Sequence, residues 1–179
     1  MTKGKSAKSV ACRTLASIFE MGVIDHHGVA IDAGAGEGDW TGPLADMFDF
    51  VHVFEPSDHK FPILMQRFRS RANVWLHKNS LAKYASQHNG RMQIDEFELK
   101  ELDFLRLEIG GAEYYAAQGG IKTIKRCRPV ILVATDERAK LHNRTPQCVI
   151  KLLEFYGYAI SELSPQRSLC TPIAQQSAR

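Results

Sequence analysis

Residues 29–41 constrain the fold of this chain more than any other part of the sequence. The segment begins with the apolar run VAI, which ends in an acid, and then places a glycine at every second position from Gly34 to Gly38. Glycines at this spacing let the backbone turn tightly with positive φ and leave no Cβ between chain and ligand. A helix that begins after such a turn points its free N–H groups into the same space. The segment therefore predicts a strand, a ligand-binding turn and a helix.

The spacing of this turn distinguishes two kinds of ligand site. Dinucleotide-binding proteins carry G-x-G-x-x-G, whereas this chain reads D-x-G-x-G-x-G through Asp32, Gly34, Gly36 and Gly38. This pattern, with an acid two residues before the first glycine, resembles the first motif of class I S-adenosylmethionine-dependent methyltransferases. The resemblance implies S-adenosyl-L-methionine as the cofactor, with Asp32 and the three glycines in its binding site.

A second acid lies where the ribose of such a cofactor would need one. Residues 51–54 form a short β-rich run, and Glu55 ends it directly before Pro56, which cannot continue a central strand. Glu55 follows Asp32 at roughly the 20-residue offset at which a strand-end acid accepts hydrogen bonds from a ribose hydroxyl pair. Glu55 is therefore a predicted cofactor ligand.

The rest of the chain alternates predicted helices and strands. The predicted helices cover residues 9–21, 40–48, 58–71, 112–127 with an interruption near 119–120, and 146–155. The predicted strands cover residues 29–32, 51–54, 74–77, 104–109, 129–134, 158–163 and 167–173. Residues 78–92 are weakly patterned, which predicts a loop with one helical turn around residues 80–85.

This alternation predicts a doubly wound α/β fold. We expect a Rossmann-like sheet of about seven strands, mostly parallel with an antiparallel C-terminal strand, and a ligand at the C-terminal strand ends. A length of 179 residues suits one methyltransferase-like domain over residues 1–179, with disordered tails at 1–8 and 174–179.

Composition and charge disfavour several other classes of protein. No apolar run approaches the roughly 20 residues of a membrane span, and the first residues lack the apolar region of a signal peptide, so we expect a cytoplasmic protein. The four cysteines form no C-x-x-C pair, and His26 and His27 point opposite ways on an extended chain, so no metal site is predicted. A net charge of +3 is mild, and the basic clusters are more typical of solvated faces than of a nucleic-acid footprint, so binding of nucleic acid is possible but not favoured. The oligomeric state is left open.

Several segments after residue 50 share a pattern with one methyltransferase family. They read FEP at residues 54–56, IDEF at 94–97, LDFLRLEIGGAE at 102–113 and GGIKTIKRCRPVILV at 119–133. This combination resembles the FkbM-type methyltransferases, in which the third segment reads like DFIKIDVEGAE. The resemblance extends from residue 29 to residue 158.

The resemblance implies further site residues, and some positions depart from it. Glu108 replaces the family's aspartate and is predicted to orient the acceptor or accept its proton, although a surface acid at a strand end is the alternative. Glu113 is predicted to contact substrate or the glycine turn, with a helix-capping acid as the alternative. Asn79, just after the third strand, is a predicted adenine contact. Gly110 and Ala134 stand where the family carries acids, and the segment before IDEF is shorter.

Two functions therefore remain open. The first is an S-adenosylmethionine-dependent O-methyltransferase that acts on a small-molecule or glycan hydroxyl. The second is a shortened, catalytically weak or inactive cofactor-binding domain that serves as an interaction module for a protein or nucleic acid, and the changed acids favour it. The glycine spacing argues against a nicotinamide-dependent oxidoreductase.

Overall fold

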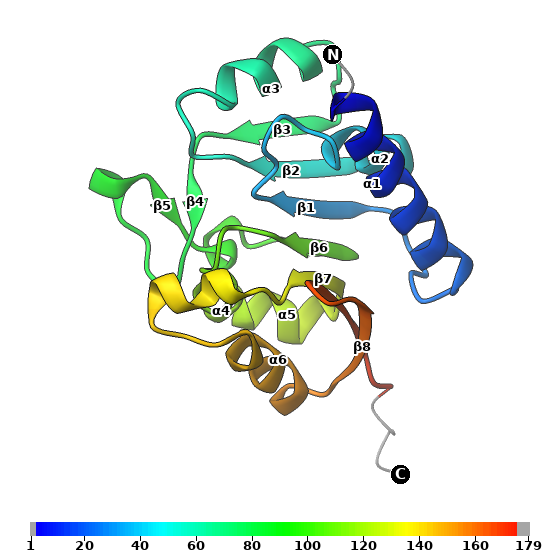
Figure 1. The fold of residues 1–179 in the computed structure, drawn as a ribbon, viewed down its shortest axis with the longest axis vertical. Helices are drawn as coiled ribbons and strands as arrows, with labels where there is room; N and C mark the ends of the chain where they lie inside the picture. The colour runs from blue at the N-terminus through cyan, green and yellow to red at the C-terminus, as the bar shows by residue number, and fades with distance from the viewer. Residues whose placement is uncertain (1–2, 175–179) are drawn as a thin grey trace.

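The computed structural model describes residues 3–174, which contain alternating strands and helices (Figure 1). The strands are β1 (Val29–Ala33), β2 (Phe50–Phe54), β3 (Val74–His77), β4 (Ser80–Leu81), β5 (Arg91–Met92), β6 (Phe104–Leu107), β7 (Val130–Ala134), β8 (Tyr158–Ser164) and β9 (Arg167–Pro172). The α-helices are α1 (Lys3–Glu20), α2 (Thr41–Met47), α3 (Phe61–Phe68), α4 (Glu113–Gly119), α5 (Ile121–Cys127) and α6 (Pro146–Phe155). Three 3₁₀ helices are η1 (Gln87–Asn89), η2 (Ile94–Phe97) and η3 (Glu137–His142).

The main sheet has the predicted doubly wound topology. Its seven strands follow the order β3-β2-β1-β6-β7-β9-β8. The pairs from β3 to β7 are parallel, whereas β9 is antiparallel to both β7 and β8. The order reverses direction at β1, and ligands of open α/β sheets bind beside such a reversal, at the C-terminal ends of the strands. The predicted fold class is confirmed.

Two apolar cores lie on opposite faces of this sheet. Helices α1, α2 and α3 cover one face, where Leu15 and Leu44 pack with Phe104 of β6. Helices α4, α5 and α6 cover the other, where Ile124 and Leu153 pack with Leu107. Strands β1 and β7 are buried along their whole length, as expected for parallel strands covered on both faces.

The structure differs from the sequence prediction in residues 78–92. This segment contains the short parallel pair β4–β5, and its helical turn is η1, not residues 80–85. It lies beyond the C-terminal ends of β1, β2 and β3, at the left of Figure 1. The predicted break near residues 119–120 is confirmed, because α4 ends at Gly119 and α5 begins at Ile121. A Cβ on Gly119 would collide with the carbonyl oxygen of Ala82. The approach of this segment to α4 therefore requires glycine.

The ends of the described chain allow a limited comparison with the predicted tails. Helix α1 begins at Lys3, within the predicted N-terminal tail of residues 1–8. Residues 1–2 and 175–179 lie outside the described residues. Within residues 3–174, no helix is both long enough and apolar enough to cross a membrane.

Candidate functional site

A cavity of about 700 Å³ opens at the C-terminal ends of β1, β2 and β6. Small-molecule sites typically measure about 300–1,000 Å³. Four of the predicted site residues line its wall: Gly34, Glu55, Asn79 and Glu108. The other four, Asp32, Gly36, Gly38 and Glu113, are not part of that wall. The four wall residues are distant in sequence but meet here, because the C-terminal ends of parallel strands share one edge of the sheet.

The glycine turn after β1 is connected to Glu55 at the end of β2. The Gly36 N–H donates to Oε2 of Glu55 at 2.8 Å, and the Ser57 N–H donates to Oε1 at 2.9 Å. Gly36 has φ of +62°, and a Cβ built there would meet no atom within 4 Å. The Glu55 carboxylate therefore holds the turn in place, and open space lies beside Gly36.

Gly34 and Gly38 are required for packing within the protein. Gly34 has φ of +79°, and a Cβ there would collide with the carbonyl oxygen of Glu108. Gly38 has φ of +87°, and a Cβ there would overlap the ring of Phe68 on α3. These two glycines thus allow the turn to approach β6 and α3 closely.

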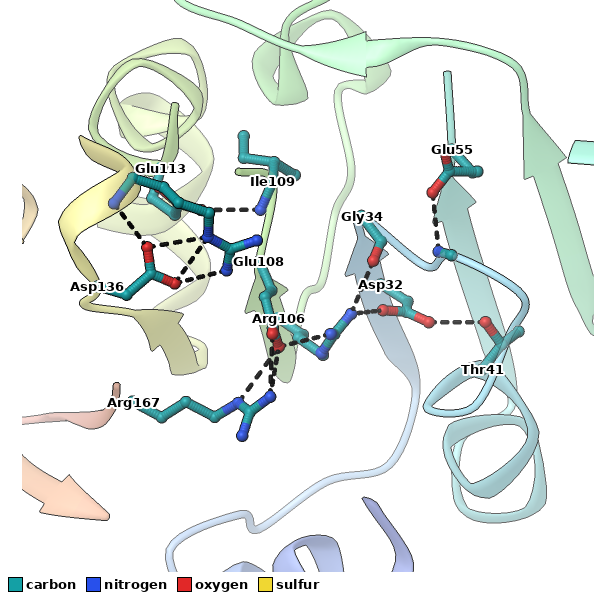
Figure 2. A network of polar contacts seen from close by, with 12 residues as sticks. Asp32, Gly34, Thr41, Glu55, Arg106, Glu108, Ile109, Glu113, Asp136 and Arg167 are labelled. Atoms are coloured by element: carbon teal, nitrogen blue, oxygen red, sulfur yellow. Dashed lines mark hydrogen bonds and ion pairs between the residues drawn. The ribbon is translucent and has the colours of Figure 1, made fainter. Parts of the chain in front are cut away.

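A chain of ion pairs begins at Asp32, which is completely buried. Asp32 lies beside Arg106 in the register of β1 and β6, and its Oδ1 accepts from Nη1 of Arg106 at 2.6 Å. Its Oδ2 accepts from the Thr41 hydroxyl at 2.7 Å (Figure 2). With both oxygens engaged and no exposure, Asp32 anchors the structure beneath the turn. Its predicted part in the cofactor site would therefore be to support the glycine turn from below.

The ion-pair chain continues from Arg106 to Glu108 and Arg167. Nη2 of Arg106 donates to Oε2 of Glu108 at 2.7 Å, and Nη2 of Arg167 donates to Oε1 at 2.9 Å (Figure 2). The Arg106 guanidinium also lies over the ring of Trp40, with 4.9 Å from Cζ to the ring centroid. Two cations and an aromatic ring thus fix the side of the cavity at the end of β6.

These partners change what Glu108 can do chemically. Burial alone would raise the pKa of its carboxyl, but the charges of Arg106 and Arg167 and their hydrogen bonds give a net lowering of that pKa. A carboxylate whose pKa is lowered is a poor proton acceptor near neutral pH. The geometry therefore favours a positioning role for Glu108 over the predicted role as a base.

Glu113 holds the loop that follows β6. Its Oε1 accepts from the N–H groups of Ile109 and Gly111, at 2.8 and 3.2 Å, and the residue is only 4% exposed. Gly111 has φ of +104°, and a Cβ there would collide with the Arg138 carbonyl. These contacts are those of the alternative role, an acid that satisfies backbone N–H groups, and they favour it over the predicted contact with substrate or the glycine turn.

Several cavity residues were missed by sequence reasoning. They come from the start of α3, from residues 78–92, from α4 and from η3, and they include Lys60, Lys83, Tyr84, Arg91, Tyr115, Arg138 and His142. None belongs to a motif. Their only sequence signal is that residues 78–92 follow the predicted third strand, where the chain must leave the sheet at its ligand edge. In residues 3–174, no cluster of three or more His, Cys, Asp or Glu side chains is suited to hold a metal ion.

A histidine pair lies beneath one side of the cavity. Nδ1 of His52 and Nε2 of His77 are 3.1 Å apart, and the His77 ring stacks on Phe54, a cavity residue, with 4.6 Å between centroids. Burial lowers the pKa of both imidazoles, and burial together with the charge of His52 lowers the pKa of His77 to about 4. Protonation of either ring is therefore resisted by the folded protein.

This pair predicts a pH dependence of folding stability. The pKa of an unfolded histidine is about 6.5, so below that pH the unfolded chain binds protons that folded His77 does not bind. We expect stability to be highest above about pH 6.5 and to fall as the pH decreases toward 4. Urea denaturation of the parent and of His77→Phe measures this, and the variant should lose part of the decline. An identical pH profile for both proteins would contradict the assignment.

Comparison with known proteins identifies similar folds but no close relative. No protein-family model matches the chain, and no curated protein matches it. Among solved structures, the FkbM methyltransferase of Methylobacillus flagellatus KT superposes with a TM-score of 0.61 at 15% identity, over 79% of this chain and 42% of that one. The magnesium protoporphyrin IX methyltransferase of Synechocystis, solved with bound S-adenosylmethionine, gives 0.59 at 13% identity, over 97% and 85%. The Methanococcus jannaschii fibrillarin pre-rRNA processing protein gives 0.57 at 17%, over 83% and 68%.

These likenesses show that the chain has the Rossmann-like fold of class I methyltransferases. At such low identity they show the fold alone, and the chain spans less than half of the FkbM structure. The neighbours differ in what they are named for, since one is a protoporphyrin methyltransferase and another a pre-rRNA processing protein.

Proposed function

We propose that this chain is an S-adenosyl-L-methionine-dependent methyltransferase and that the cavity at the strand ends is its cofactor and acceptor site. The hydrogen bond from the Gly36 N–H to the Glu55 carboxylate carries this proposal. It joins the glycine turn of the first motif to the acid at the end of β2, and Glu55 lines the cavity. The Synechocystis neighbour, which has the same fold and was solved with S-adenosylmethionine, supports this choice of cofactor.

The residues around the cavity fit this cofactor. Each Glu55 oxygen accepts one backbone N–H and has a second lone pair for a ribose hydroxyl. Asn79 lines the wall and offers both an amide donor and an acceptor for the adenine edge. Gly36 is not itself part of the cavity wall, but it donates to Glu55, which is, and no atom lies within 4 Å of a Cβ built on Gly36, which leaves room for a ligand beside the turn. When bound, this cofactor supplies an electrophilic methyl group on a sulfonium centre.

The chain's own contribution to catalysis is positioning. Methyl transfer is an in-line displacement, so its rate depends on holding the acceptor atom in line with the leaving group. Glu108, fixed by Arg106 and Arg167, forms a rigid part of the wall and orients the acceptor. We assign the acceptor as a hydroxyl oxygen of a small molecule or glycan. His142 lines the same cavity, and its imidazole, the commonest kind of general base in enzymes, is the candidate for that role in place of Glu108.

Replacing Glu55 with alanine tests the cofactor site. We expect Glu55→Ala to bind S-adenosylhomocysteine about 10- to 150-fold more weakly, because a hydrogen bond to a charged group contributes about 1.5–3 kcal/mol. Isothermal titration calorimetry measures the affinity, and Glu162→Ala on exposed β8 is the control, which should bind like the parent. Parental affinity in Glu55→Ala would contradict the assignment of Glu55 to the ribose.

The second candidate function is a cofactor-binding interaction module without methyl transfer. The ion pairs that hold Glu108, and the absence of carboxylates at Gly110 and Ala134, favour it. Incubation with methyl-labelled cofactor and pooled small molecules, glycans and nucleic acids separates the two functions. Label in the small-molecule or glycan fraction supports the enzyme, whereas tight cofactor binding with no transfer to any fraction supports the module.

A further inference from the structure

The outer wall of the cavity carries three cationic side chains without acidic partners. Lys60 comes from the residue before α3, whereas Lys83 and Arg91 come from residues 78–92. Arg91 lies beside Ser80 in the β4–β5 pair, so both ends of this segment face the cavity. Within the described part of the chain, none of the three forms an ion pair.

The acids of the same cavity are already engaged. Glu55 accepts from two backbone N–H groups, and Glu108 lies between two guanidinium groups. The remaining cation of the wall, Arg138, is paired with Asp136. Glu55 keeps its negative charge, but the three unpaired cations Lys60, Lys83 and Arg91 outnumber it, and a cleft with an excess of one sign of charge concentrates ligands of the opposite sign.

An exposed aromatic ring accompanies these cations. Tyr84 is 69% exposed although it lines the cavity, and the Lys83 ammonium lies 5.0 Å from the centre of its ring. Ligand sites commonly combine an aromatic surface with a few charged groups that fix orientation. Tyr84 thus offers a surface for a planar or apolar part of a ligand beside the cationic groups.

The basic cluster on and after α3 is partly neutralised by acids. Arg67 and Arg71, from the basic cluster on and after α3, pair with Asp39 and Asp46. Lys60, Lys83 and Arg91, in contrast, are gathered in the wall of one cavity. This arrangement fits a compact anion better than a polyanion that tracks along a surface.

We propose that the acceptor is a small molecule that carries a phosphate or carboxylate group, bound by Lys60, Lys83 and Arg91. Tyr84 packs against the part of the acceptor next to that anionic group. This inference rests on the proposed methyltransferase function and adds the acceptor's chemical class to it. The anionic group anchors the acceptor away from the reacting oxygen, and binding energy from such a remote group improves the alignment of the reacting atoms.

Calorimetric titration of small anions into protein saturated with S-adenosylhomocysteine tests this inference. The probes are inorganic pyrophosphate for the phosphate class and citrate for the carboxylate class. We expect at least one to bind, with an affinity that falls as ionic strength rises. The variant Lys83→Gln/Arg91→Gln should bind that anion at least about tenfold more weakly and keep its affinity for S-adenosylhomocysteine within about threefold. Lys140→Gln, an exposed residue outside the cavity, should match the parent.

The outcomes separate this inference from the proposed function. Binding of S-adenosylhomocysteine without binding of either anion overturns the inference and leaves the function standing. Competition between the anion and S-adenosylhomocysteine, or an equal loss of both in the double variant, assigns the cations to the cofactor carboxylate and also overturns it. Tighter binding of single-stranded RNA than of either anion overturns the small-molecule class. Failure to bind S-adenosylhomocysteine contradicts the proposed function itself, and the inference with it.

Discussion

Gly36→Val should abolish measurable binding of S-adenosylhomocysteine, with a loss of about 100-fold or more in affinity. The valine side chain would enter the open space beside the glycine turn, where the structure places no protein atom within 4 Å of a built Cβ. We expect the bound ligand to occupy that space, so the valine side chain would exclude it. The substitution therefore removes ligand binding without a collision between the new Cβ and the protein.

Gly22→Val is the matched control for this substitution. Gly22 has the same φ of +62° and likewise has no atom within 4 Å of its built Cβ, but it lies just after α1. A left-handed backbone costs a non-glycine residue roughly 1–2 kcal/mol, so urea denaturation should show similar destabilisation in both variants. Calorimetry should show lost binding only in Gly36→Val. Equal binding by the two variants would contradict a ligand beside Gly36.

Arg106→Met should lower the free energy of unfolding by about 3–5 kcal/mol, because it leaves the Asp32 charge buried without its partner. The side chains of Arg106 and Asp32 are 6% and 0% exposed, so water cannot replace the lost contact. Urea denaturation measures the change. The double variant Asp32→Asn/Arg106→Met should be more stable than Arg106→Met alone, since it also removes the unpaired charge.

Arg71→Met provides the control for an exposed ion pair. Arg71 and Asp46 are 2.6 Å apart, but their side chains are 44% and 60% exposed. Such pairs contribute about 0–1 kcal/mol, so this variant should be nearly as stable as the parent. A similar small loss for Arg106→Met would show that the buried ion-pair chain contributes little to folding.

The sequence predicted the sheet because its signals are local. Parallel strands covered on both faces must be apolar along their length, and β1 and β7 show this in five consecutive residues each. Glycines with positive φ after β1 likewise identify the turn without knowledge of distant residues. The buried strands and the glycine turn were thus accessible from the sequence.

The role of Asp32 was not accessible, because it depends on strand register. Its spacing from the glycines indicated a cofactor contact, but its actual partner, Arg106, lies 74 residues away in sequence. Glu108 similarly meets Arg167 across 59 residues, through the strand that returns antiparallel beside β7. The sequence motifs suggested that these carboxylates contact a ligand, whereas in the folded sheet arginine side chains from other strands bind them.

The outer cavity wall was also missed, for a different reason. Strands β4 and β5 contain two residues each, too few to produce a periodic pattern. Residues 78–92 therefore read as a loop although, besides the predicted Asn79, they supply Lys83, Tyr84 and Arg91 to the cavity. The segment was shorter than the resemblance implied, yet it still closes one side of the site.

Calorimetric titration of the folded parent protein with S-adenosylhomocysteine, and separately with NAD, tests the central claim most directly. The D-x-G-x-G-x-G turn and its hydrogen bond to Glu55 predict saturable one-site binding of S-adenosylhomocysteine and much weaker binding of NAD. Folding is verified in the same sample by cooperative urea denaturation. Absence of heat with S-adenosylhomocysteine at millimolar concentration, or tighter binding of NAD, would contradict the assignment of this cavity to S-adenosylmethionine.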